Sequence, residues 1–428
     1  MHPDGDDVLL PVKLFITRLM LCLMPAYIPT SLKKSGPFHW PFKNFLPRIF
    51  VDDTVQQAVL NTAYRGTQNR QTEKNMNVHP ISRSRVLAFV FLLLLPSLLA
   101  ACWTGKAELR KQADDHPTMT IGYWGHGWEA KPFHERIAPA PAGLIEKICI
   151  ENRIGDFPER PVPADPAPEF SAALRRIEAL LPEKVGRLAA ERIIGVFLVR
   201  DLGGTGYAEA VRDETGKERF AVIVLDRDVL LKRKANDWAT WKEKSIFKAS
   251  PGTNIDLTVR IEEDAGNSVE SAIEYILLHE IGHALGMAGG VHPSWNGAPS
   301  VDAWPFVRLS WRMNGTVVES LFDRMFFERT AIRPYAFEKS TVAIAQAGGV
   351  YLGLTWTNFP TLPAASGLWE DFAESFVHYL HVVRGKRPYE VRIRDAGVPD
   401  AVFSSCWNEY RCAAKRAYLE RWMEDPLR

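Results

Sequence analysis

One short segment constrains the fold of this chain more than any other: residues 277–292 read LLHEIGHALGMAGGVH. Residues four apart lie on one face of an α-helix, so His279 and His283 would present two imidazoles to one metal ion. Glu280, next to the first histidine, would reach a water molecule beside that ion. The neighbouring residues are almost all apolar or glycine, which predicts a helix buried in the core. The segment therefore predicts a metal site on a core helix, with Glu280 as the catalytic base.

The helix that carries this segment has clear predicted ends. Ser268, or Ser271 as an alternative, is a good N-cap, and Gly289-Gly290 would stop the helix after about Met287. A third metal ligand is still needed, because a catalytic zinc site has three protein ligands and one open position. In the longer form of the motif a histidine would stand where this chain has the first of these glycines. His292, which follows the Gly-Gly turn, is one alternative ligand.

A second segment, residues 369–381 (WEDFAESFVHYLH), offers another ligand. Glu370, Glu374 and His378 recur every fourth residue, so they form an acidic and imidazole stripe along one side of a predicted helix. Burying such carboxylates is costly unless they are paired or bound to a metal. The alternative is an ordinary solvated helix face. This stripe is therefore a better source of the third ligand than His292, and Glu370, Glu374 and His378 are all candidates.

Together the two segments resemble the zincin metallopeptidases, specifically the gluzincins, in which a downstream glutamate completes the His-Glu-x-x-His site. Residues 370–376 (EDFAESF) are similar to the Glu-x-Phe-Ala-Glu-x-Phe helix of the anthrax lethal factor type of metallopeptidase. The resemblance implies that Glu370 joins the two histidines as a ligand of one Zn²⁺ ion and that Glu374 supports the site. We expect Glu374, and with it His378, to hydrogen-bond a ligand imidazole. The resemblance is confined to these two helices.

One position departs from that family. Its members have a tyrosine that stabilises the oxyanion seven residues before the ligand glutamate, and here that position is Pro363. Tyr351, the nearest upstream tyrosine, is an alternative that no spacing rule requires. The resemblance nevertheless implies hydrolysis of a peptide or related amide, with Glu280 passing a proton from water to the leaving amine. We expect a strand at 220–225 to present an edge to which the substrate adds.

Two other functions are alternatives. One is a non-catalytic binding or structural lipoprotein that keeps the metal-site scaffold; the missing tyrosine favours it and the intact Glu280 opposes it. The other is a zinc amidase acting on cell-wall peptides, which an envelope location would permit. The formal net charge of +1 gives no electrostatic case for nucleic acid as a partner. A peptide or protein is the expected substrate.

Residues 76–101 have the anatomy of a secretory signal: two arginines, an apolar run, and small residues before Cys102. Leu-Ala-Ala-Cys resembles the bacterial lipobox, whose cysteine is lipidated, and a plain signal peptide is the alternative. We therefore expect Cys102 to anchor the protein to a membrane. Trp103, in place of the aspartate that retains lipoproteins in the inner membrane, favours the outer membrane facing the periplasm. Residues 1–75 would then be a non-native or disordered extension.

The cysteine pattern fits an oxidising compartment. Cys406 and Cys412 are close enough in sequence to form a local disulfide, which would leave Cys149 free. No Cys-x-x-Cys occurs, so a cysteine-based zinc or redox site is not expected.

The remaining periodicity predicts an α+β fold with a zincin-like domain. Residues 102–168 are expected to be a tether followed by an irregular segment rich in glycine, proline and aromatics. Residues 169–428 are expected to form the catalytic domain, with a small sheet, an active-site helix and a mostly helical C-terminal half. Besides the helix that starts at Ser268, the pattern predicts helices over 169–193, 336–347, 369–383 and 407–423, and strands over 194–199, 206–211, 220–225 and 255–261.

Overall fold

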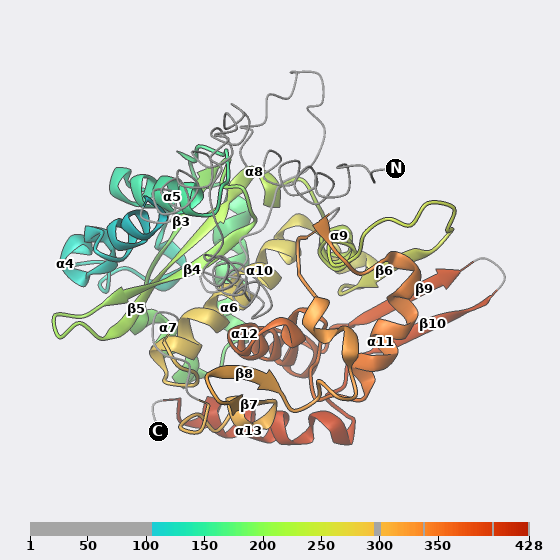
Figure 1. Ribbon diagram of the computed structural model, residues 1–428. Helices are drawn as coiled ribbons and strands as arrows, with labels where there is room; N and C mark the ends of the chain where they lie inside the picture. The colour runs from blue at the N-terminus through green and yellow to red at the C-terminus, as the bar shows by residue number, and fades with distance from the viewer. Residues whose placement is uncertain (1–104, 295–300, 337–338, 396–397, 427–428) are drawn as a thin grey trace, which may run out of the picture. The chain divides into compact units, whose positions relative to one another are not determined.

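A computed structural model of the chain describes residues 105–294, 301–336, 339–395 and 398–426 (Figure 1). The predicted extension at 1–75, the signal segment at 76–101 and Cys102 lie outside these described residues. Within them, no helix combines the length and the apolar character needed to cross a bilayer.

Helices and strands are mixed along the described chain and its later half is rich in helix, which is the α+β class that the sequence predicts. The strands are β1 (Ile137–Pro139), β2 (Val162–Pro163), β3 (Ile193–Arg200), β4 (Gly206–Arg212), β5 (Glu218–Asp226), β6 (Asp256–Arg260), β7 (Trp311–Asn314), β8 (Val317–Ser320), β9 (Glu390–Asp395) and β10 (Val398–Ser404). The helices are α4 (Ile121–Trp124), α5 (Ala142–Ile154), α6 (Pro168–Leu180), α7 (Glu183–Arg192), α8 (Arg227–Leu230), α9 (Ala235–Lys244), α10 (Val269–Ala288), α11 (Ala347–Thr355), α12 (Leu368–Tyr379) and α13 (Ala413–Glu424).

The main sheet is mixed and has the order β1-β3-β5-β4. Strands β1, β3 and β5 are parallel, β4 is antiparallel to β5, and β2 pairs with the end of β3. The expectation that residues 220–225 present an edge is wrong, because β5 is paired on both sides. Asp213 folds the chain back after β4 by accepting hydrogen bonds from the N–H groups of Thr215 and Lys217. Because β5 rather than β4 pairs with β3, β4 lies at the edge of the sheet.

The predicted core helix is α10. Ser268 caps it, its hydroxyl accepting a hydrogen bond from the N–H of Ser271 at 3.2 Å. Gly289 ends it, followed by Gly290 in the left-handed region at φ 64°. Nearly every side chain of α10 is buried, as expected for a helix that packs on all sides. It lies between the main sheet and α12, with α6 and α9 also in contact (Figure 1).

Glycine lets α10 and α12 approach closely. A Cβ added at Gly282 would lie 3.0 Å from the Cα of Ala373 and 3.2 Å from its carbonyl oxygen. Both of these neighbours are backbone atoms of α12, which cannot rotate away as a side chain can. The absence of a side chain at Gly282 therefore sets the separation of the two helices that carry the predicted metal ligands.

The segment at 102–168, predicted as a tether and an irregular segment, contains regular structure where it is described. Residues 105–114 are helical, β1 and β2 join the main sheet, and α5 packs against it. Leu144 and Ile148, four residues apart on α5, form a buried cluster with Val199 and Val224 of the sheet. The sheet therefore obtains cover for one face from a segment whose many glycines and prolines hid its periodicity.

Two expected helices differ from the structure in the later half. The expected helix at 336–347 is not formed in its described residues, because the hydroxyl of Ser340 donates to the carbonyl of Ile246 and the N–H of Lys248 donates to the carbonyl of Val342. Helix α11 begins only at Ala347. The helix expected at 169–193 is interrupted by Pro182, which separates α6 from α7.

The C-terminal part contains more strand than the sequence predicts. The strand expected at 255–261 is present as β6, but it pairs with β9 in a separate sheet of order β10-β9-β6. Strands β7 and β8 form a further hairpin. Cys406 and Cys412 are joined in a disulfide, while Cys149 is a free, half-buried thiol. The disulfide loop precedes α13, which therefore starts six residues after the expected Trp407.

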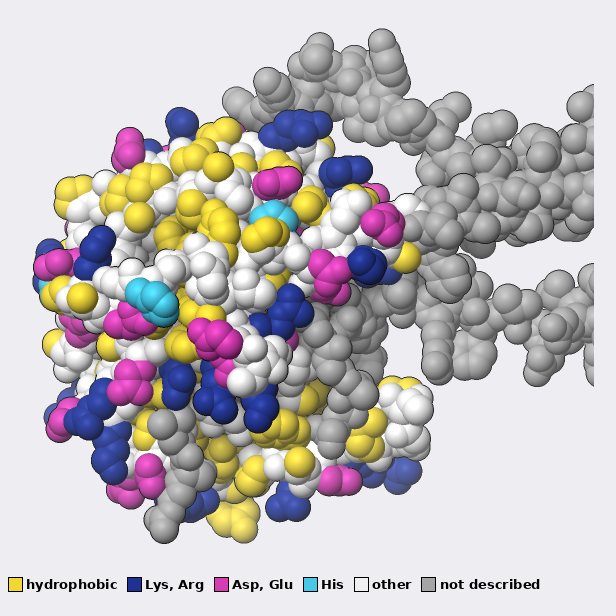
Figure 2. Space-filling model, turned by 90° about the vertical axis from the view of Figure 1, so that its left-hand side faces the viewer, with side chains coloured by type: hydrophobic (Ala, Val, Ile, Leu, Met, Phe, Trp, Pro, Cys, Tyr) yellow, Lys and Arg dark blue, Asp and Glu magenta, His cyan; other side chains and the backbone are white. Residues whose placement is uncertain are grey.

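On the face drawn in Figure 2, acidic and basic side chains are interspersed, with hydrophobic side chains between them. This face offers a surface of mixed charge.

Candidate metal centre

Helices α10 and α12 bring three metal-binding side chains together. His279 and His283 project from α10, and Glu370 projects from the first turn of α12. The Nε2 atoms of the two histidines lie 3.1 Å apart. Glu370 Oε2 lies 3.5 Å from Nε2 of His279, and its Oε1 lies 3.3 Å from Nε2 of His283. These are the three ligands that the sequence predicts, and they form one group able to hold a metal ion.

The spacing of these donors fits a tetrahedral zinc ion. Zinc binds nitrogen and oxygen ligands at about 2.0–2.2 Å, so two ligand atoms of a tetrahedral site lie about 3.3–3.6 Å apart. The separations of His283 and His279 from Glu370, 3.3 and 3.5 Å to different oxygens of its carboxylate, fall in this range, and the separation of the two imidazole nitrogens, 3.1 Å, is slightly shorter. Two imidazoles and one carboxylate form a donor set that zinc accepts, and three protein ligands leave a fourth position open. The residues present therefore fit the expected ion.

Glu374 lies behind one of these ligands. Its Oε1 is 3.0 Å from Nδ1 of His279 and also contacts Nζ of Lys242. Its Oε2 accepts a hydrogen bond from the hydroxyl of Thr361 at 2.8 Å. Burial disfavours the charge, but Lys242 and His279 hold the pKa of Glu374 well below its usual value. A carboxylate at Nδ1 favours the tautomer that turns the Nε2 lone pair of His279 toward the metal.

Glu280 is buried on α10 beside the three donors. Burial raises the pKa of Glu280 to about 7, with His279 opposing this shift and Glu370 adding to it. The N–H of Ala208, on the edge strand β4, donates a hydrogen bond to its carboxylate. A carboxylate with a pKa near neutrality can both accept and release a proton at physiological pH. The edge of β4 therefore borders a group with the properties of a general base.

His292 lies apart from the metal-binding group. It is buried with its Nδ1 3.1 Å from the carbonyl of Pro293, and its ring faces Phe372 and the backbone of α10 at Gly286. Burial lowers the pKa of His292 to about 3, so the ring is neutral. Among the described residues, the group that can share a metal ion does not include it.

His378 does not make the expected contact with a ligand imidazole. Its ring packs edge-on against Tyr389 at 4.3 Å and lies near Trp407, and neither ring nitrogen has a hydrogen-bond partner among the described residues. The reason is helical geometry. At 3.6 residues per turn, a side chain eight residues after Glu370 is rotated by about 80° around the helix axis. The stripe of residues spaced by four therefore turns away from the metal-binding group before it reaches His378.

The tyrosine expected to stabilise an oxyanion has no equivalent at Pro363, which begins a buried 3-10 turn, Pro363–Ser366, before α12. Tyr351 is also turned elsewhere, because its hydroxyl donates to Oε2 of Glu243 at 2.7 Å. A third tyrosine, Tyr335, which the sequence did not single out, interacts electrostatically with the carboxylates of this region. Burial raises the pKa of Tyr335 well above its usual value; a hydrogen bond with the side chain of Thr205 opposes the shift, and the charges of Glu374, Glu370 and Glu280 add to it.

The backbone of Tyr335 is held in an unusual conformation. Its φ of 61° is in the left-handed region, which is uncommon for a residue with an aromatic side chain. Its N–H donates to the hydroxyl of Ser245 at 2.7 Å, and its ring packs 5.5 Å from that of Trp241. Such strained positions often occur at functional sites. Local sequence contains no signal for it, because its place depends on contacts with α9 across some ninety residues.

Lys242 and Glu243 on α9 were also missed. Lys242 contacts Glu374, and Glu243 accepts hydrogen bonds from the hydroxyls of Tyr351 and Tyr389. Burial raises the pKa of Glu243 to about 7, against the opposing charge of Lys242. A signal was present in the sequence: Lys242 follows Ala235, Trp238 and Ala239 at helical spacing, so it falls on the buried face of α9.

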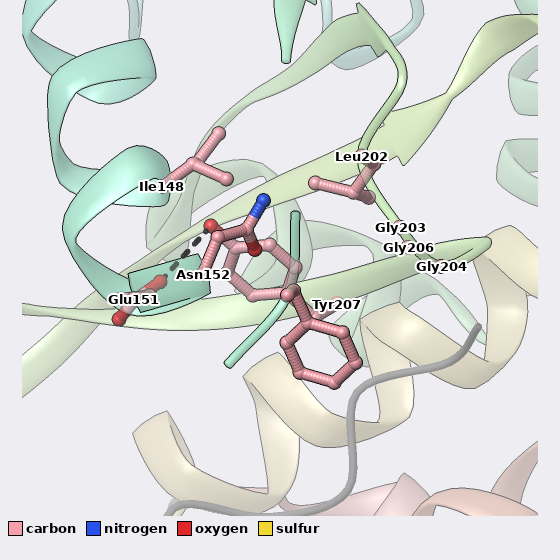
Figure 3. A pocket seen from close by; sticks show the side chains of 9 residues that line it. Ile148, Glu151, Asn152, Leu202, Gly203, Gly204, Gly206 and Tyr207 are labelled. Carbon is pink, nitrogen blue, oxygen red and sulfur yellow. Dashed lines mark hydrogen bonds between the residues drawn. The ribbon is translucent and has the colours of Figure 1, made fainter. Parts of the chain in front are cut away.

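Two hollows lie outside the metal-binding group. One lies between α5 and the loop before β4, next to Glu151 and Tyr207 (Figure 3). It holds about 10 Å³, the space of one water molecule. The other, of about 140 Å³, is lined by Tyr351, Thr361 and Tyr389 among others, close to the residues that support the metal-binding group. Neither brings together three metal-binding side chains of the described residues.

No family model matches this chain, and no curated protein or solved structure matches it either.

Proposed function

We propose that the protein is a zinc-dependent metallopeptidase of the gluzincin type. One observation carries the proposal: His279, His283 and Glu370 meet close to the spacing of zinc ligands, and Glu280 is buried beside them on the same helix. A metal site that served only structure would have four protein ligands and no need of a neighbouring base. Three donors with an adjacent buried carboxylate are the pattern of a hydrolytic site.

In this proposal the chain supplies proton transfer and orientation. A zinc ion at the site would polarise a water molecule and the carbonyl of the scissile amide. Glu280 accepts the proton of the attacking water and returns it to the leaving amine. Glu374 keeps His279 in the orientation and tautomer that a ligand needs. The burial of Glu280 keeps bulk water from competing for the proton.

Substrate binding and charge stabilisation involve two further parts of the chain. Strand β4 is at the edge of the sheet and its Ala208 N–H reaches Glu280, so a peptide added along this edge would pass the base. This replaces the strand at 220–225 as the proposed docking edge. Tyr335, near the three carboxylates, is the candidate hydrogen-bond donor to the oxyanion, in the role that Pro363 cannot fill.

Glu280→Gln tests the proposal. The amide keeps the shape of the carboxylate but cannot accept a proton, so peptide hydrolysis should fall by about 10²- to 10⁴-fold while one zinc ion per chain stays bound. Hydrolysis of a casein or mixed-peptide substrate measures the first, and metal analysis measures the second. Tyr335→Phe should lower kcat more than it raises KM. Full activity in Glu280→Gln would refute the mechanism.

The alternatives predict different results. A non-catalytic binding lipoprotein would bind zinc but show no hydrolysis in the wild type either. A zinc amidase would cleave muropeptides and leave casein intact. The proposed location, a lipid anchor at Cys102 in the outer membrane, predicts that Cys102→Ser moves the protein from the membrane fraction to the soluble fraction. An unchanged distribution would show that the cysteine is not the anchor.

A further inference from the structure

The buried ammonium group of Lys242 forms an ion pair with Glu374, one of the carboxylates around the metal-binding group. Lys242 is 6% exposed and Glu374 is 1% exposed, and the Lys242 Nζ contacts Glu374 Oε1. The same Nζ lies 5.5 Å from the centre of the Trp238 ring and 5.9 Å from that of Tyr275. The aromatic rings hold the lysine in place, so the ammonium has little freedom to move away from the carboxylate.

The oxygen that Lys242 holds is the one that faces a metal ligand. Glu374 Oε1 lies 3.0 Å from Nδ1 of His279, while Thr361 holds the other oxygen. A contiguous path therefore runs from α9 through α12 to α10: ammonium, carboxylate, imidazole. The opposite nitrogen of the imidazole, Nε2, is the one that faces His283 and Glu370.

Charge balance explains why an ammonium is needed there. Three carboxylates, of Glu280, Glu370 and Glu374, share a largely buried volume. An isolated carboxylate in such surroundings would protonate or move toward water. A divalent ion compensates two of the negative charges, and Lys242 compensates the third. Removing Lys242 would leave Glu374 without its cation, with only the hydroxyl of Thr361 to hold its carboxylate toward His279.

We propose that Lys242 is a positioning residue of the metal site, which holds the carboxylate of Glu374 against Nδ1 of His279 and so presents Nε2 to the ion. This inference rests on the proposed metal site but not on the proposed peptidase activity. Lys242 touches no reacting atom, so its effect is on metal affinity and coordination geometry rather than on proton transfer.

The test compares two buried ion pairs whose carboxylates both lie on α12. Lys415 pairs with Asp371 on α12, and both are 0% exposed. Asp371 follows Glu370 in the chain, but its carboxylate bonds to Lys415, Trp311 and Ser375 rather than to a metal-binding side chain. Lys242→Met and Lys415→Met each break a buried pair. Zinc affinity is measured by competition with a chromophoric chelator, and the visible spectrum of the Co²⁺-substituted protein reports on geometry.

Lys242→Met should weaken zinc binding by about 10- to 100-fold and change the cobalt spectrum. Lys415→Met should leave zinc affinity within about twofold of the wild type, because the carboxylate that it releases bonds to no metal-binding side chain. Glu374→Gln should weaken zinc binding as much as Lys242→Met does. The double variant should bind zinc no more weakly than the single variant with the lower affinity, since the two residues act through one contact. If Lys242→Met does not fold, Lys242→Gln keeps a hydrogen-bond donor, one bond shorter than the lysine side chain, and should give a smaller loss.

Wild-type zinc affinity with an unchanged cobalt spectrum in a folded Lys242 variant would overturn the inference while leaving the metal site intact. An equal loss in Lys415→Met would also overturn it, because the effect would then be general destabilisation. A wild-type protein that binds no zinc would overturn both the inference and the proposed function. Retained hydrolysis in Glu280→Gln would overturn the mechanism alone.

Discussion

Gly282→Ala tests the link between helix packing and the metal site. The new methyl group would lie 3.0 Å from Ala373 Cα, 3.1 Å from the Phe376 ring and 3.2 Å from Ala373 O. Normal contacts of this kind are about 3.5–4.0 Å, so α10 and α12 must separate by roughly 0.5 Å or more. Overpacking of this kind costs about 1–3 kcal/mol, and replacing glycine by alanine in a helix gains about 1 kcal/mol, so the net loss of stability is up to about 2 kcal/mol.

The same shift moves Glu370 away from the two histidines. Ligand distances tolerate deviations of about 0.2 Å, so zinc must pull the helices back together against the methyl group. A cost of 1–2 kcal/mol corresponds to about a tenfold weaker affinity. Urea unfolding of the metal-free protein and chelator competition measure the two effects separately.

Gly349→Ala on α11 is the matched control, because a Cβ there meets nothing within 4 Å. It should raise the free energy of unfolding by up to about 1 kcal/mol and leave zinc affinity unchanged. A Gly282→Ala protein that is as stable as the wild type and binds zinc equally well would refute the reasoning, because the close approach at Gly282 would then not set the ligand spacing.

Two further predictions concern buried titratable groups. Burial raises the pKa of Glu243 to about 7 in the folded protein, so its contribution to stability is full below pH 4.5 and is lost as the pH rises through 7. The free energy of unfolding of the metal-free wild type should therefore fall between pH 4.5 and 7.5. In metal-free Glu243→Gln this fall should be smaller by about 3 kcal/mol. An identical pH dependence in the two proteins would contradict the pKa of Glu243. Burial lowers the pKa of His378 to about 3, so its contribution to stability is present above pH 6.5 and is lost as the pH falls. When the pH is lowered from 7.5 to 5, the free energy of unfolding of His378→Leu should fall by about 2 kcal/mol less than that of the wild type, as measured by urea unfolding. A large loss of zinc affinity in His378→Leu would instead restore the supporting role that the sequence predicted for it.

The parts of the site that the sequence predicts are those encoded by local helical periodicity. His279, Glu280 and His283 are neighbours on one helix, and the caps at Ser268 and Gly289 mark its ends. Glu370 and Glu374 share a face of α12 for the same reason. The pairing of α10 with α12 was predicted from the resemblance of their two motifs to the gluzincins. In the structure, the absence of a side chain at Gly282 allows the two helices to pack closely.

The parts that were missed depend on contacts between distant segments. Lys242 meets Glu374 across 132 residues, and Tyr335 reaches the carboxylates through a loop with no periodic pattern. Strand order is equally non-local: nothing in residues 206–225 indicates which strand of the hairpin pairs with β3, and this decides that β4 forms the edge. The predicted contact between His378 and a ligand imidazole was wrong, because a spacing of four residues only approximates the helical repeat over two turns.

The central claim is that His279, His283 and Glu370 hold one zinc ion, and the most direct measurement is zinc stoichiometry and affinity in the wild type and in Glu370→Ala. We expect one ion per chain in the wild type. In Glu370→Ala we expect an affinity more than about a hundredfold weaker, because loss of a supporting residue alone costs about 10- to 100-fold. A wild type that binds no zinc, or a Glu370→Ala protein that binds it as tightly as the wild type, would contradict the claim.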